Sequence, residues 1–118
     1  MNLITVAVVA NGSTEELKYT LESIVAQSTE DFDVITVCGG TPDDVTAAAH
    51  GYADEYVGFS VLECEKMLIP QCRNLAAANA KTEYIMFVDA GDYIAPESIE
   101  KIIKTAEEKK PDIITTRY

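Results

Sequence analysis

The sequence predicts an α/β domain in which a mostly parallel sheet carries helices on both faces. Segments with strand character alternate with segments of helical period along the chain, which is typical of β-α-β units. The first strand candidate is continuously apolar, as in strands that are buried on both faces. The 118 residues, of which 47% are hydrophobic and 25% charged, correspond to one globular domain. We therefore expect residues 1–118 to form a single domain of Rossmann-like architecture.

The expected strands are short runs rich in β-branched or other apolar residues, separated by segments of helical character. The runs at 3–10, 33–37 and 84–88 demand cover on both faces, so we expect these three strands to be adjacent and parallel. In chain order the expected strands are residues 3–10, 33–37, 56–62, 84–88 and 112–116.

The first two helices carry start signals. Ser13 and Glu16 have the spacing of a capping box, and an apolar stripe follows them. The second helix is expected to begin with the hydroxyl of Thr41 as its cap, followed by proline at the first helical position and two acids. We expect it to run to about His50, where Gly51 ends it.

The remaining two helices are bounded by prolines or rich in alanine. Residues 69–80 contain several alanines, which suits a helix that lies close to a sheet. Pro96 opens the last helix, whose isoleucines recur at helical spacing, and Pro111 closes it.

The charge balance excludes two classes of partner. Nine lysines and arginines against twenty aspartates and glutamates give a net charge of −11. Such a surface repels phosphate backbones and anionic lipids, so we expect no binding to nucleic acid or to a membrane surface.

The cysteines and the apolar runs bear on the compartment. Cys38, Cys64 and Cys72 are odd in number and contain no CxxC pair, which argues against a disulfide framework or a structural zinc site. The longest apolar run, residues 3–10, is far shorter than the roughly 20 residues of a transmembrane helix. It also lacks the basic leader of a signal peptide. We expect a cytoplasmic protein with no transmembrane segment.

Three turns are candidate parts of a ligand site. In open parallel sheets, ligands bind outside the carboxyl ends of the strands. Residues 10–13, 38–44 and 89–92 are polar or glycine-bearing turns that directly follow apolar strands. The alternative that these are ordinary connections stays open, because every α/β domain has such turns.

Asp89 and Asp92 follow a strand within four residues of each other. Mg²⁺ or Mn²⁺ is held by oxygen ligands, often one or two carboxylates together with substrate phosphates. The pair is therefore a candidate metal site. The alternative is that Asp89 caps a turn and Asp92 is solvated.

Two further segments could contact an anion. The backbone of Cys38-Gly39-Gly40 could approach a phosphate or a base, and a helix N-terminus follows it. Asp43 and Asp44 at that helix start would repel a phosphate, so a plain turn is favoured. Arg73 either neutralises a diphosphate or pairs with a surface glutamate.

Several of these segments together resemble a known enzyme family. The relevant ones are VVAN (8–11), SIVAQS (23–28), DFD (31–33), GT (40–41), RN (73–74) and EYIMFVD (83–89). In this order they resemble the family 2 glycosyltransferases of GT-A fold, and the resemblance covers residues 3 to about 114.

The resemblance implies a nucleotide-diphospho-sugar donor bound together with Mg²⁺ or Mn²⁺. It also implies that a second half of the protein, beyond Tyr118, supplies the catalytic base and the acceptor site. We therefore expect this chain to be the N-terminal part of a longer protein and to transfer no sugar on its own. The expected donor-binding residues are Asn11, Cys38, Gly39, Gly40, Arg73 and Asp89, and the expected metal ligands are Asp89 and Asp92.

The chain departs from the family pattern at the donor site. Val8 and Ala10 replace a proline and a tyrosine, Cys38 and Gly39 replace two acids, and Gly91 replaces the middle acid of an Asp-x-Asp-Asp motif. These replacements favour an alternative, a degenerate and non-catalytic member that serves as a binding or assembly module. An unrelated Rossmann-like regulatory domain is a third possibility.

Overall fold

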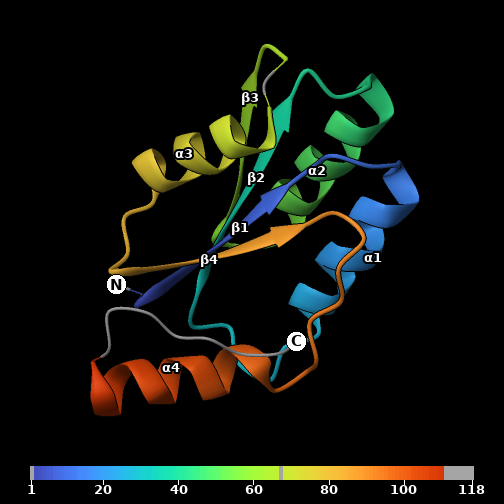
Figure 1. The fold of residues 1–118 in the computed structure, drawn as a ribbon. Helices are drawn as coiled ribbons and strands as arrows, with labels where there is room; N and C mark the ends of the chain where they lie inside the picture. The colour runs from blue at the N-terminus through green and yellow to red at the C-terminus, as the bar shows by residue number, and fades with distance from the viewer. Residues whose placement is uncertain (1, 67, 111–118) are drawn as a thin grey trace.

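The computed structural model describes residues 2–66 and 68–110 of the chain. Within these residues, strands and helices alternate strictly from one end to the other (Figure 1). In order, the elements are β1 (Ile4–Val9), α1 (Thr14–Val25), β2 (Asp33–Gly39), α2 (Asp43–Glu55), β3 (Phe59–Cys64), α3 (Ile69–Asn79), β4 (Tyr84–Asp89) and α4 (Ser98–Lys109).

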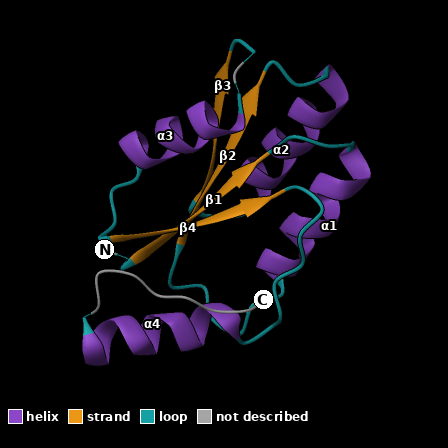
Figure 2. Cartoon of the chain, viewed as in Figure 1, coloured by secondary structure: helices purple, strands orange, loops and turns teal. Residues whose placement is uncertain are grey.

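The four described strands form one sheet in the order β3-β2-β1-β4, and all neighbours run parallel (Figure 2). In the register, Val6 of β1 lies opposite Val34 of β2 on one side and Met86 of β4 on the other. The expectation that the strands near residues 3–10, 33–37 and 84–88 are adjacent and parallel is confirmed. Their order also places β1 between β2 and β4.

Helices cover both faces of the sheet, as expected. Val6 and Val8 of β1 belong to the core cluster that includes buried residues of α1, α2 and α4. Ala7 and Val9, which alternate with them, pack in a second cluster with Cys72 of α3. The continuous apolar run of β1 is explained by this arrangement, because each of its faces meets a helical layer.

The capping box at the start of α1 is confirmed. The Ser13 side chain accepts a hydrogen bond from the Glu16 amide at 3.1 Å, and the Ser13 amide donates to Glu16 Oε1 at 3.0 Å. Two of the amides that a helix leaves without intrahelical partners at its first turn are satisfied in this way.

The expected limits of α2 were wrong at both ends. Pro42, not Thr41, is the N-cap, and the Thr41 hydroxyl instead lies 2.6 Å from that of Thr46. The helix continues through Gly51 to Glu55. Glycine costs a helix only about 1 kcal/mol relative to alanine. The apolar face of α2 extends beyond Gly51 and packs on the core, so tertiary contacts outweigh that cost.

The end of β2 was also placed incorrectly. Cys38 and Gly39 were expected in a loop, but they continue the strand and lie opposite Glu63 and Cys64 of β3. The strand expected at 56–62 begins later, at Phe59. The last expected strand, 112–116, lies outside the described residues.

No helix in the described part of the chain has both the length and the apolar character needed to cross a membrane.

Candidate functional site

The three turns predicted from the sequence lie at the same edge of the sheet. The Ala10 amide donates to the Val37 carbonyl at 3.0 Å, which joins the end of β1 to β2. The Ala90 amide donates to the Val9 carbonyl at 3.0 Å, which joins the turn after β4 to β1. Because β1 is central, its following turn lies between the other two.

A cavity of about 280 Å³ opens between the turns after β1 and β2 and the start of α3. Its volume is close to the lower limit of roughly 300 Å³ for small-molecule pockets. Three residues predicted to bind the donor, Asn11, Gly39 and Gly40, line it. The full lining is Val9, Ala10, Asn11, Gly12, Gly39, Gly40, Thr41, Pro42, Ile69 and Cys72.

Cys38 is not among the lining residues of this cavity. Its side chain is buried in the core, at 2% exposure, because Cys38 belongs to β2 and not to a loop. Burial is also the main cause that raises the pKa of the Cys38 thiol. The thiol therefore acts as a small apolar core group in this structure.

Gly40 is the first residue of the turn after β2. Its φ is +67°, and a Cβ at this position would lie 2.7 Å from Cα of Lys66. Backbone cannot give way as a flexible side chain can, so a glycine is required here for two independent reasons.

We expect Gly40→Ala to lower the free energy of unfolding by at least about 1–3 kcal/mol, the usual cost of a strained backbone conformation. The clash with Lys66 adds to this cost. Urea unfolding followed by circular dichroism measures the change. Gly51→Ala is the control, since a Cβ at that helical position meets nothing within 4 Å and should stabilise the protein slightly. Equal stability of the Gly40→Ala variant and the unsubstituted protein would contradict the conclusion that this turn requires a glycine at position 40.

Arg73 of α3 forms an ion pair with Asp89 at the end of β4. Nη2 lies 3.2 Å from Oδ2 and 3.4 Å from Oδ1 of Asp89. The centre of the guanidinium lies 6.0 Å from the centroid of the Phe87 ring. The sequence left Arg73 between a diphosphate and a surface glutamate; its partner in this structure is instead the carboxylate of Asp89, a predicted metal ligand.

Asp92 closes the turn that follows β4. Its Oδ2 accepts a hydrogen bond from the Asp89 amide at 3.2 Å, and its own amide donates to the Asp89 carbonyl at 3.0 Å. Gly91 within this turn has a φ of +101°. The two predicted metal ligands thus lie in one closed turn at the carboxyl edge of the sheet.

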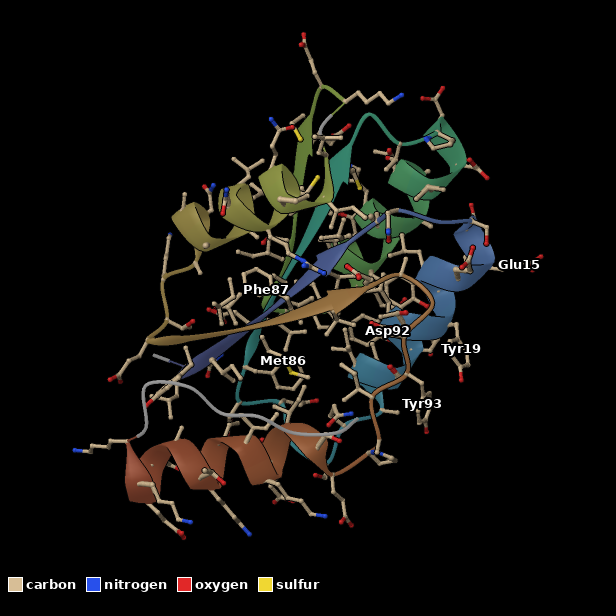
Figure 3. All side chains as sticks on the ribbon, viewed as in Figure 1. Glu15, Tyr19, Met86, Phe87, Asp92 and Tyr93 are labelled. Carbon is tan, nitrogen blue, oxygen red and sulfur yellow. The ribbon has the colours of Figure 1, made fainter. Side chains whose placement is uncertain are left out.

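Helix α1 holds this turn in place through Thr20. The buried Thr20 hydroxyl accepts from the Gly91 amide at 2.9 Å and donates to the Asp92 carbonyl at 2.7 Å. On the solvent side of the same contact, the rings of Tyr19 and Tyr93 lie 5.6 Å apart (Figure 3).

Gln27, just beyond α1, fixes the chain between β4 and α4. Its buried amide donates to the carbonyls of Ile94, at 3.2 Å, and Ala95, at 2.8 Å, and its Oε1 accepts from the Ile99 amide at 3.1 Å. The sequence reasoning gave Gln27 and Thr20 no structural role. The available signal was that both polar residues lie near the apolar stripe of the helix, where a buried polar group needs partners.

The pair Asp89 and Asp92 fits a divalent cation in its donor chemistry. Both residues supply carboxylate oxygens, the ligands that Mg²⁺ and Mn²⁺ prefer, although in this structure the Asp89 carboxylate is paired with the Arg73 guanidinium and Asp92 Oδ2 accepts from the Asp89 amide. No group of three or more potential ligands (His, Cys, Asp or Glu) occurs among the described residues. Within the described residues, this turn offers two carboxylates, and the other ligands would be substrate phosphates or water.

A larger cavity, of about 470 Å³, lies at the opposite edge of the sheet. It is bordered by the starts of β2 and β3, including Asp33 and Phe59. Because ligands of open parallel sheets bind at the carboxyl ends of the strands, we assign the candidate site to the smaller cavity and the adjoining turn of β4.

Comparison with known proteins identifies the family. The model of the family described as "Glycosyl transferase family 2" matches residues 5–118. The chain belongs to glycosyl transferase family 2. This confirms the resemblance inferred from the sequence motifs.

Curated relatives of the chain include two proteins of Bacillus subtilis (strain 168). The chain is 29% identical over 94 residues to the uncharacterized glycosyltransferase EpsJ, and 30% identical over 98 residues to the putative glycosyltransferase EpsH. These matches cover 80% and 83% of this chain but 27% and 28% of the relatives. The chain thus spans less than a third of the length of these relatives.

Solved structures show the GT-A fold. TarS of Staphylococcus aureus in complex with UDP matches with a TM-score of 0.83 and 23% identity, over 92% of this chain and 33% of that one. The mannosyltransferase PcManGT from Pyrobaculum calidifontis, in complex with GDP-Man and Mn²⁺, matches with a TM-score of 0.65 and 19% identity, over 76% and 28%. The GT-A-type fold expected from the sequence is confirmed.

Proposed function

We propose that this chain forms the donor-binding part of a family 2 glycosyltransferase and binds a nucleoside diphospho-sugar through a divalent cation, Mg²⁺ or Mn²⁺. The supporting observation is that the Asp89–Asp92 turn, Arg73 and the cavity lined by Asn11 lie at one edge of the sheet. TarS has been solved with UDP and with UDP-GlcNAc, and PcManGT with GDP-Man and Mn²⁺.

Each group has a chemical role in this proposal. Asp89 and Asp92 hold the cation, which when bound neutralises diphosphate charge that the protein, at −11, would otherwise repel. Arg73 offers the diphosphate a planar set of N–H donors. The turns at Asn11 and at Gly39-Gly40 contact the nucleoside in this proposal. The two glycines do so through backbone groups, and the buried side chain of Cys38 takes no part.

Sugar transfer by the whole protein is part of the same proposal. The chain corresponds to less than a third of the curated relatives' length, and we propose that residues outside it supply the acceptor site and the base that deprotonates the acceptor hydroxyl. This chain then contributes the donor, positioned at the carboxyl edge of its sheet.

Isothermal titration of the chain with UDP, with and without Mn²⁺, tests the donor site. We expect weak binding, with a Kd of about 0.1–1 mM, that disappears when EDTA removes the metal. Uridine monophosphate is the control, because it lacks the diphosphate that would bridge to the cation. Binding that persists in EDTA would show that Asp89 and Asp92 are not a metal site. Failure of both UDP and GDP to bind in Mn²⁺ would overturn the proposal in favour of a non-catalytic module.

A further inference from the structure

We propose that Arg73 couples cation binding to donor binding by exchanging its partner, from the Asp89 carboxylate to the diphosphate of the donor. This inference rests on the proposed function and adds a regulation of the same site. In the structure, Nη2 of Arg73 lies 3.2 Å from Oδ2 of Asp89, so a positive charge is already next to the carboxylate that would bind the cation.

The ion pair is placed so that it can open. The side chain of Arg73 is 42% exposed and that of Asp89 is 34% exposed. Solvent-exposed ion pairs of this kind are weak, because water screens both charges. Only one terminal nitrogen of the guanidinium, Nη2, contacts the carboxylate, whereas a tight arginine pair uses two.

The rest of the Arg73 head group is not fully satisfied. Nε is buried and has no hydrogen-bond partner among the described residues. The guanidinium also lies beside the Phe87 ring, which supports its planar face but accepts no in-plane hydrogen bond. A diphosphate provides several acceptor oxygens and could engage more of these donors than Asp89 does.

The charges determine the direction of the coupling. A divalent cation at Asp89 would meet the positive guanidinium at the same carboxylate, so Arg73 opposes cation binding when no donor is present. A bound diphosphate gives Arg73 another anionic partner and leaves Asp89 available. Cation and donor therefore favour each other, and linkage requires the effect to be reciprocal.

The inference predicts that removing Arg73 increases the affinity of the site for a metal ion. Arg73→Gln should tighten Mn²⁺ binding in the absence of nucleotide by about ten-fold, which lies within the usual range of coupling between sites. The same variant should weaken UDP binding and reduce the factor by which UDP tightens Mn²⁺ binding. A residue with a merely structural role would not improve the affinity of the site for a metal.

The measurement is a titration with Mn²⁺ alone, followed by the electron paramagnetic resonance signal of the free ion, and then repeated with UDP. Lys81→Gln is the matched control, because it also removes one positive charge. Lys81 is exposed and lies two residues after the end of α3. We expect less than a two-fold change in that variant. Arg73→Lys keeps the charge and should retain Mn²⁺ affinity close to that of the unsubstituted chain.

The outcomes separate this inference from the proposed function. Unchanged or weaker Mn²⁺ binding in Arg73→Gln overturns the proposed exchange of partners by Arg73. If the unsubstituted chain then still binds UDP in a Mn²⁺-dependent way, the proposed donor site is retained. An equal gain in Lys81→Gln would also overturn it, since the effect would then be one of overall charge. Absence of Mn²⁺ binding in every variant overturns both. Thermal melts of all variants confirm that each is folded under the titration conditions.

Discussion

Replacing Asp89 with asparagine should weaken Mn²⁺-dependent UDP binding at least about 10-fold. A charge-assisted contact contributes about 1.5–3 kcal/mol, and the variant loses the charge that would face the cation in the donor complex. Since the unsubstituted chain is expected to bind with a Kd of about 0.1–1 mM, titration calorimetry in the presence of Mn²⁺ should detect little or no binding by the variant. The effect should be specific to this position, because the proposal places Asp89 in contact with the cation.

Asp43→Asn is the matched control for this prediction. Asp43 is an exposed acid in the first turn of α2, which begins at the same edge of the sheet beside the cavity. Its substitution removes the same charge and should change UDP binding less than about three-fold, the scale of a screened surface charge. Similar losses in both variants, or full binding by Asp89→Asn, would refute a cation site at Asp89.

Replacing Gln27 with leucine should lower the free energy of unfolding by about 3 kcal/mol or more. The amide of Gln27 satisfies carbonyls of Ile94 and Ala95 and the amide of Ile99, and all of these lose their partner. An unsatisfied buried polar group costs about 1–3 kcal/mol. Leucine has a similar volume, so loss of hydrogen bonds and not an empty cavity determines the result.

Urea unfolding compared with Gln71→Leu tests this second prediction. Gln71 is exposed at the start of α3 and accepts one hydrogen bond, from the Leu68 amide at 2.9 Å. We expect that control to cost less than about 1 kcal/mol, since water can replace an exposed partner. A comparable loss in both variants would mean that the Gln27 contacts do not carry the stability of the segment between β4 and α4.

The arrangement of the candidate site followed largely from sequence reasoning. Continuous apolar runs indicated strands with two covered faces, and the rule that ligands bind at the carboxyl ends of parallel strands indicated the turns near Asn11, Gly40 and Asp89. The structure places these turns together because β1 lies between β2 and β4. The roles predicted for individual residues at this edge remain predictions.

The chemistry within the site depended on contacts that no local pattern reveals. Arg73 and Asp89 are 16 residues apart, and the sequence left the partner of Arg73 undecided between a diphosphate and a surface glutamate. The backbone of Cys38 was expected in a turn near the donor, but pairing with β3 extends β2 past this residue, whose side chain is buried.

Local sequence patterns were sufficient to predict the alternation of elements, the burial of β1 on both faces and the capped start of α1, because these depend on periodicity and on side chains three residues apart. By contrast, the end of α2 and the side-chain contacts across the sheet edge depend on packing between distant elements. Packing of the apolar face of α2 outweighs the small local penalty of Gly51. Likewise, the partners of Arg73 and Gln27 come from elements far apart in the chain, so their positions are set by the packed sheet and helices and not by neighbouring residues.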